Sequence, residues 1–138
     1  ENNPNIFYAS SHQYPFYPGT GSFNEVGVGN IFNCPLPSDC DSSSFRTLFK
    51  KNIIDKIDTK FDLIYFSAGF DAHASDPLAN INLAEEDFAW VTGRLCDLAD
   101  KHCNGRLVST LEGGYDLDAL AKCVTTHLKT LLDRGRNV

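Results

Sequence analysis

The sequence predicts an α/β fold with a mostly parallel sheet, and three features of the chain point to it. Short apolar runs of strand length alternate with longer segments whose apolar residues recur at helical spacing. Their order is strand, long loop, helix, strand, helix, strand, helix, which is typical of parallel strands joined by right-handed crossovers. One strand, residues 61–67, is apolar almost throughout, as where helices cover both faces of a sheet. Three parallel strands are few for such a sheet, so the 138 residues look like part of a larger structure.

The first half of the chain contains one predicted strand, a long loop and a helix. Residues 6–10 are apolar and predict a short buried strand. Residues 12–44 are rich in Gly, Pro, Asn and Ser, and a weakly structured stretch of that length usually serves function. A helix follows to about Asp58, with Ser43 or Ser44 as its N-cap.

The second half predicts two strands and two helices. The strand over residues 61–67 leads to a helix over residues 85–102, whose acidic start suits the helix dipole and which Asn104-Gly105 would end. A strand over residues 106–111 and a last helix over residues 117–133 complete the pattern. The inward residues predicted for the last helix are Leu120, Val124, Leu128 and Leu131.

Charge and composition exclude several classes of protein. The net charge is −6, and the longest basic cluster is Lys50 and Lys51, so we expect no direct contact with nucleic acid. No apolar stretch approaches the roughly 20 residues of a membrane span, and no signal peptide is recognisable. The five cysteines are an odd number without C-x-x-C spacing. We therefore expect reduced thiols in a cytoplasmic protein that contacts no membrane.

Three loops would leave the carboxyl ends of the predicted strands, namely residues 11–21, 68–78 and 112–116. They have the least usual composition in the chain. In open α/β sheets ligands bind outside these strand ends. We therefore expect the three loops to converge on one cleft.

The second of these loops contains the candidate metal ligands. Asp71 could bind a metal, act as a general base or cap a turn. Asp76 precedes Pro77, which favours a turn role. His73 is weak evidence for a ligand, because a single loop histidine is usually solvated.

The other two loops offer groups that could face a substrate. Gly113 and Gly114 allow close approach of the backbone or a positive φ. Tyr115 could donate a hydrogen bond to a developing oxyanion or could pack on the sheet edge with its hydroxyl in water. Residues 14–21 contain three aromatic side chains set by two prolines and end in glycines, so this stretch could line a narrow channel or form a small hydrophobic cluster.

Four stretches together resemble the zinc-dependent histone deacetylase and acetylpolyamine amidohydrolase superfamily, which has an arginase-like fold. They are SSHQYPFYPGTG (residues 10–21), GVGNIFNCPLP (27–37), SAGFDAHASDPL (67–78) and LEGGYDL (111–117). They follow the family's order with family-like spacing and cover nearly the whole chain. The LEGGY version looks more like the bacterial and class II-like branch. The resemblance implies the C-terminal portion of a three-layer α/β/α fold with a mostly parallel sheet.

The resemblance also implies roles for individual residues. Asp71 matches the family's third zinc ligand. Tyr115 matches the catalytic tyrosine that polarises the amide carbonyl and stabilises the oxyanion. Tyr17 matches an aromatic residue that sandwiches the stem of the acyl-lysine, and Leu78 matches a residue of the channel wall.

Two further pairs have implied roles near the reacting acyl group and at a second ion. Gly113 and Gly114 match the floor of the site beside the acetyl group. Ser10 and Ser11 match the inner potassium site, although Ser11 replaces the usual leucine. The implied cofactors are therefore zinc, with ferrous iron as the alternative, and potassium.

The sequence departs from the family at the remaining metal ligands. The family needs two adjacent histidines, one of them the general base, and an Asp-x-His segment that gives the other two zinc ligands. No two histidines are adjacent in this sequence, and its one Asp-x-His, Asp71 to His73, belongs to the Asp71 motif itself, where His73 matches no family ligand. We therefore expect residues 1–138 to be the C-terminal part of a single deacetylase-like catalytic domain. By itself the chain should be inactive, since one carboxylate binds zinc poorly.

The expected partners follow from this interpretation. They are an acetylated lysine peptide or acetylpolyamine, the N-terminal part of the same domain, and a second copy of the chain where the first strand exposes an edge. The alternative is a non-catalytic α/β binding or assembly module that keeps the fold. An Asp-x-His and a His-His motif in the upstream coding sequence would decide for the enzyme.

Overall fold

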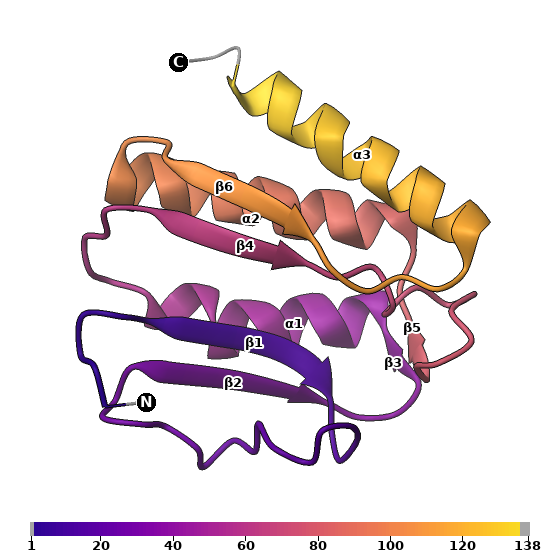
Figure 1. The fold of residues 1–138 in the computed structure, drawn as a ribbon, viewed down its shortest axis with the longest axis horizontal. Helices are drawn as coiled ribbons and strands as arrows, with labels where there is room; N and C mark the ends of the chain where they lie inside the picture. Colours follow the sequence, from indigo (N-terminus) through magenta and orange to yellow (C-terminus); the bar gives the residue numbers. More distant parts are fainter. Residues whose placement is uncertain (1, 136–138) are drawn as a thin grey trace. The chain divides into compact units, whose positions relative to one another are not determined.

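Parallel strand pairing organises both halves of the chain, of which the computed structural model describes residues 2–135 (Figure 1). The chain divides into unit 1, residues 1–58, and unit 2, residues 59–138. Unit 1 contains β1 (Tyr8–Gln13), β2 (Ile31–Leu36), β3 (Cys40–Asp41), α1 (Ser42–Asn52) and a 3-10 helix (Ile54–Lys56). Unit 2 contains β4 (Ile64–Ala68), β5 (Ile81–Asn82), α2 (Glu85–Cys103), β6 (Leu107–Leu111) and α3 (Leu117–Gly135). The predicted α/β class with parallel strands is confirmed.

Unit 1 is built on a parallel pair, β1 and β2, that the sequence only half predicts. β1 begins at Tyr8, two residues later than expected, and pairs with Ile31 at the start of β2. β2 lies within residues 12–44, for which the sequence predicts a weakly structured loop, and that prediction is wrong. The sequence did not predict this strand because it contains Pro35, and proline, which lacks a backbone N–H, normally argues against a paired strand. In the structure Pro35 lies opposite His12.

Two buried asparagines hold the irregular chain on either side of β1. Asn30 Nδ2 donates to the Ile6 carbonyl at 2.7 Å. Asn33 Nδ2 donates to the carbonyls of Ser22 and Glu25, both at 3.1 Å. Side-chain amides thus satisfy backbone groups of a segment that has no regular structure of its own.

Helix α1 covers β2 in unit 1. Its N-cap is Asp41, whose side chain accepts a hydrogen bond from the Ser44 N–H at 2.8 Å, so the prediction of Ser43 or Ser44 as the cap is wrong. The predicted continuation to Asp58 is replaced by the 3-10 helix Ile54–Lys56. The buried apolar residues of unit 1 are Cys34, Leu36, Cys40, Phe45, Phe49 and Ile53.

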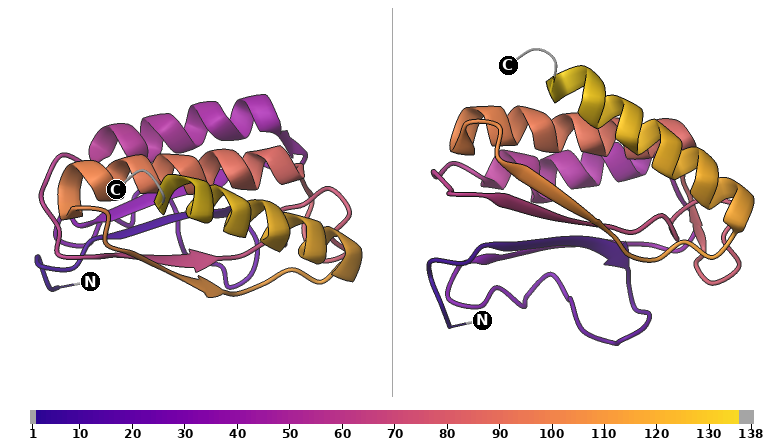
Figure 2. Two further views of the ribbon diagram at one scale, coloured as in Figure 1. Left: turned by 90° about the horizontal axis from the view of Figure 1, so that it is seen from above. Right: turned by 45° about the horizontal axis from the view of Figure 1, so that its top comes forward.

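Unit 2 is built on the parallel pair β4 and β6, whose register sets Ile64 opposite Leu107. α2 and α3 pack against each other and lie on the same side of this pair (Figure 2). The opposite face of the pair carries Tyr65 and Val108, which are 61% and 46% exposed. The two long helices of unit 2 therefore cover one face of the strand pair, whereas the apolar run 61–67 predicts helices on both.

The two long helices begin where the sequence predicts. α2 starts at Glu85 and is ended by Asn104 in the left-handed conformation, φ 53°. α3 starts at Leu117, but its inward face differs from the predicted leucine stripe, and Leu128 is 51% exposed. The buried residues of α3 are Ala119, Cys123 and His127. Because these residues are small or polar, a search for large apolar residues at helical spacing does not find the buried face of α3.

His127 is a buried histidine that joins both helices to the strands. Its Nδ1 lies 2.8 Å from Thr92 Oγ1 and its Nε2 lies 2.9 Å from Ser109 Oγ. The Thr92 hydroxyl donates to the Phe88 carbonyl, so it accepts from Nδ1–H, and Nε2 accepts from Ser109 in the neutral ring. Burial lowers the pKa of His127, because water is excluded from the charged form.

All five cysteines are unpaired, in agreement with the expected thiols, and all five are buried. None of the helices within residues 2–135 has the length and apolar character needed to cross a bilayer.

We predict that His127 makes the protein less stable in mild acid. The pKa of His127 in the folded state lies below the ordinary value of 6.5. As pH falls below that value, the imidazole is therefore protonated in the unfolded chain before it is protonated in the folded chain. The free energy of unfolding should therefore fall as pH drops through this range. Urea unfolding of wild type and of His127→Gln between pH values of about 7.5 and 5.5 measures the contribution. If both proteins lose stability in parallel, His127 is not the cause.

Candidate active site

The two loops that leave β4 and β6 are joined by backbone hydrogen bonds beyond the last strand pair. The ladder ends with Ala68 opposite Leu111. The Glu112 N–H then donates to the Ala68 carbonyl at 3.0 Å, and the Phe70 N–H donates to the Gly113 carbonyl at 2.7 Å. Both strands point the same way, so both loops leave from the same end of the pair (Figure 1). The structure thus brings residues 68–78 and 112–116 side by side, as predicted, and a cleft at that place stays a prediction.

The carboxylate of Asp71 lies in a hollow between two glycines. A Cβ atom at Gly113 would lie 2.5 Å from Asp71 Oδ2, and one at Gly69 would lie 3.2 Å from Oδ1. Any side chain at Gly113 would therefore displace the carboxylate. Burial raises the pKa of Asp71, since the charged form loses solvation there. A partly buried carboxylate whose pKa is raised by desolvation is a candidate functional group.

Gly114 is required for a different reason. Its φ is +138°, a conformation that side chains rarely adopt, and a Cβ atom there would lie 2.8 Å from Leu120 Cδ1 and 3.2 Å from Phe70 Cβ. The predicted need for glycine at both positions is thus explained by close packing at Gly113 and by backbone conformation at Gly114. Tyr115 follows directly, with its side chain 54% exposed.

Asp76 connects the two loops through its side chain. It is 8% exposed, and its Oδ1 accepts from the Leu78 N–H at 2.9 Å. That contact is the predicted turn role. Its Oδ2 accepts from the Tyr115 N–H at 2.8 Å, which the sequence did not predict. The Asp-Pro signal identifies the turn but carries no information on a partner 39 residues away.

His73 is a structural residue of the loop and is 9% exposed, so the expectation of a solvated histidine is wrong. Its Nδ1 accepts from the Ser75 N–H at 3.1 Å, and its ring stacks on Phe88 with centroids 6.5 Å apart. Nε2 faces Glu85 Oε2 at 3.6 Å. These contacts hold the turn after Asp71.

Leu78, at the end of this loop, is 58% exposed.

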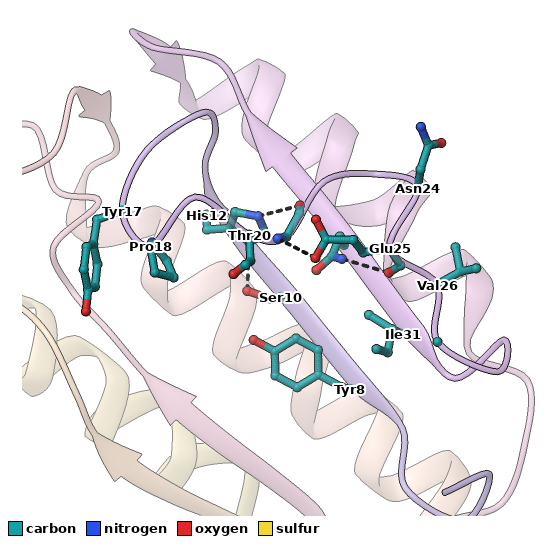
Figure 3. A pocket seen from close by; sticks show the side chains of 13 residues that line it. Tyr8, Ser10, His12, Tyr17, Pro18, Thr20, Asn24, Glu25, Val26 and Ile31 are labelled. Atoms are coloured by element: carbon teal, nitrogen blue, oxygen red, sulfur yellow. Dashed lines mark hydrogen bonds between the residues drawn. The ribbon is translucent and has the colours of Figure 1, made fainter. Parts of the chain in front are cut away.

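Two of the remaining predicted residues, Ser10 and Tyr17, line a cavity of about 550 Å³ in unit 1 (Figure 3). Ser10 Oγ lies 2.9 Å from His12 Nδ1, and His12 Nε2 donates to the Gly21 carbonyl at 2.8 Å. Tyr17 is 91% exposed. Ser11, the next residue of β1, is partly buried. The convergence of residues 11–21 with the two loops of unit 2 stays a prediction.

The donor atoms of Asp71 fit one position around a zinc ion, but one position does not make a site. Within residues 2–135, no group of three or more His, Cys, Asp or Glu side chains could hold a metal ion. A catalytic zinc needs about three protein ligands. The chain thus offers Asp71 as a single ligand, and a complete zinc site would need further ligands.

Comparison with known proteins gives matches among deacetylases. The family model for the histone deacetylase domain matches residues 1–131. Histone deacetylase 10, chloroplastic, from Oryza sativa subsp. japonica is 38% identical over 135 residues, which cover 94% of this chain and 30% of that protein. A probable deacetylase from Archaeoglobus fulgidus is 36% identical over 123 residues, covering 85% of this chain and 34% of that protein.

A solved structure matches as well. The crystal structure of the HDA15 HD domain superposes with a TM-score of 0.84 at 30% identity, covering 96% of this chain and 38% of that one. The chain spans less than half of the length of the curated relatives named above.

We predict that Gly113→Ala destabilises the protein by about 1–3 kcal/mol, the usual cost of overpacking. The added methyl would meet Asp71 Oδ2, and the carboxylate would have to move. Gly135→Ala is the control, because nothing lies within 4 Å of a Cβ atom there. Urea unfolding measures both, and equal stability of the two variants would contradict the close contact.

We also predict that Asp71→Asn stabilises the metal-free protein at pH 7. Because the pKa of Asp71 is raised by burial, its charged form costs stability above that pKa, and the amide removes this cost. The advantage should shrink as pH falls through the raised pKa and the carboxyl group takes up its proton. Asp41→Asn is the opposite control, since hydrogen bonds from Ser44 lower the pKa of Asp41 and favour its charge. If the wild type were more stable than Asp71→Asn at pH 7, burial of the charged Asp71 side chain would not cost stability, and the prediction would be wrong.

Proposed function

Because the chain belongs to the histone deacetylase family and has the α/β fold of deacetylase domains, we propose that it is the C-terminal part of a metal-dependent deacetylase domain. The proposed substrate is an acylated lysine side chain or an acetylated polyamine, and the net charge of −6 suits either. One observation carries the proposal. The Phe70–Gly113 hydrogen bond brings the loop of Asp71 against the loop of Tyr115.

The two residues have different proposed roles. Asp71 is a metal ligand, for zinc or alternatively ferrous iron, and its glycine hollow supports that role. When bound, such a metal supplies a water activated for attack on the amide carbonyl. Tyr115 donates a hydrogen bond from its hydroxyl to the acyl oxygen as negative charge develops there.

The remaining residues have proposed roles around this chemistry. Tyr17 stacks on the apolar stem of the substrate, and its 91% exposure leaves the ring available. Leu78, also exposed, forms part of the channel wall, and Gly113 with Gly114 forms the floor near the acyl group. Ser10 and Ser11 are proposed ligands of a potassium ion. A cytoplasmic location is part of the proposal, supported by the five unpaired thiols.

The proposal requires partners for catalysis. A general base and further metal ligands have to come from another part of the same domain, and the substrate is the second partner. This chain alone should therefore be inactive. Assembly with a second copy of itself remains a proposal without a specific contact to support it.

The test is to measure zinc content and acetyl-lysine hydrolysis on this chain alone and then mixed with the N-terminal part of the domain. We expect no turnover from the chain alone, and about one zinc per complex with turnover from the mixture. Turnover by the chain alone would show that its own residues complete the site. A mixture that stays metal-free and inactive would favour a non-catalytic binding module.

In the active mixture, Tyr115→Phe should lower kcat by about 10²–10³-fold, the usual cost of losing one oxyanion donor. Zinc content should not change, because the hydroxyl is not a proposed ligand. Tyr65→Phe is the matched control: it removes the hydroxyl of another exposed tyrosine of unit 2, one that bonds Thr110 on β6. A loss of zinc in Tyr115→Phe, or equal loss of kcat in both variants, would contradict the role.

A further inference from the structure

Asp76 is a buried carboxylate that serves two groups facing the proposed substrate. It is 8% exposed, and each of its oxygens accepts one backbone hydrogen bond. Oδ1 accepts from Leu78 at 2.9 Å and Oδ2 accepts from Tyr115 at 2.8 Å. Both partners are neutral N–H groups, and hydrogen bonds to an ionised acceptor are stronger than bonds between neutral groups.

Tyr115 needs such a contact because of what precedes it. Gly113 and Gly114 give the backbone more freedom than other residues would, and Gly114 has φ +138°. The Phe70–Gly113 bond fixes the chain two residues before Tyr115, and the Asp76 bond fixes Tyr115 itself. The two contacts together hold the glycine pair at both ends.

Asp76 is itself held in place. Its own N–H donates to the His73 carbonyl at 2.9 Å, and the His73 N–H donates to the Phe70 carbonyl at 3.2 Å. The buried Phe70 ring contacts Phe88 of α2, with centroids 5.2 Å apart. The carboxylate therefore extends from a turn that is anchored in the core of unit 2.

We propose that Asp76 is a positioning residue, which sets the place of the Tyr115 hydroxyl relative to Asp71 by holding the Tyr115 backbone. The inference rests on the proposed function and adds a residue to it. Asp76 does not touch the substrate, and it acts through Tyr115. Its bond to Leu78 extends the same control to the channel wall.

The test is a double-mutant cycle in the complete, zinc-loaded domain. Asp76→Asn keeps the shape of the side chain but replaces one acceptor oxygen by a donor group, so one of the two bonds is lost. We expect kcat to fall by about tenfold or more while KM changes by less than about threefold, because small displacements of a catalytic group mainly reduce turnover. Zinc content should stay at the wild-type level, since Asp71 is held by the Phe70–Gly113 pairing.

The Tyr115→Phe background separates positioning from a general structural role. If Asp76 acts through the Tyr115 hydroxyl, Asp76→Asn should change kcat by less than about twofold once that hydroxyl is gone. Asp116→Asn is the matched control, because it makes the same chemical change beside Tyr115, at a carboxylate that accepts from the Ala119 N–H at the start of α3. We expect this control to keep the wild-type kcat.

Each outcome decides the matter. Equal loss of kcat in both backgrounds, no loss in either, or loss of zinc would overturn the proposal. Asp76→Ala removes both bonds and should give a larger loss than Asp76→Asn, which can keep its oxygen toward Tyr115; where the alanine variant does not fold, Asp76→Leu, which is closer in size, removes both bonds in its place. A wild-type domain without turnover would instead refute the proposed function, and this inference with it.

Discussion

The parallel ladder of β4 and β6 continues beyond the strands through the 2.7 Å hydrogen bond from the Phe70 N–H to the Gly113 carbonyl. The other features of the candidate site depend on it. Because this bond fixes the register of the two loops, the carboxylate of Asp71 lies against the Gly113 backbone. The same register brings the Tyr115 N–H within 2.8 Å of Asp76. A shift of one residue would separate all three contacts at once.

Stability and chemistry oppose each other at this site. Asp71 carries a charge in a place where burial raises its pKa, and the glycines beside it lack side chains that would fill the hollow. Packing of the neighbouring residue Phe70 offsets these costs, because its ring is buried and contacts both Phe88 and His127. The partly buried carboxylate and the two glycines beside it thus lie together where a metal ligand is proposed, and local costs in stability are common at functional sites.

Local signals made part of this structure predictable. Helix α2 carries its acidic start, its apolar stripe and its Asn104 end within its own sequence, so its bounds differ from the prediction by one residue. Strand β2 exists through pairing with β1 and contains Pro35, so no local rule identifies it. The residue types and loop positions of Asp71 and Tyr115 left several roles open, and only the resemblance to a family favoured one role for each. The hydrogen bond between Asp76 and Tyr115 was not predictable. The two residues are 39 positions apart in the sequence, and they meet because of the register in which β4 and β6 pair.

We infer that the two loops of unit 2 are joined by these hydrogen bonds before any metal or substrate binds. Amide hydrogen exchange on the metal-free chain, followed by NMR, tests it most directly. The Phe70 and Tyr115 N–H groups should exchange more slowly than unstructured peptide by orders of magnitude, because each donates a hydrogen bond within the folded unit. Exchange at the unstructured rate for both groups, with the β4 and β6 amides still protected, would show that the two loops are not joined in the metal-free chain.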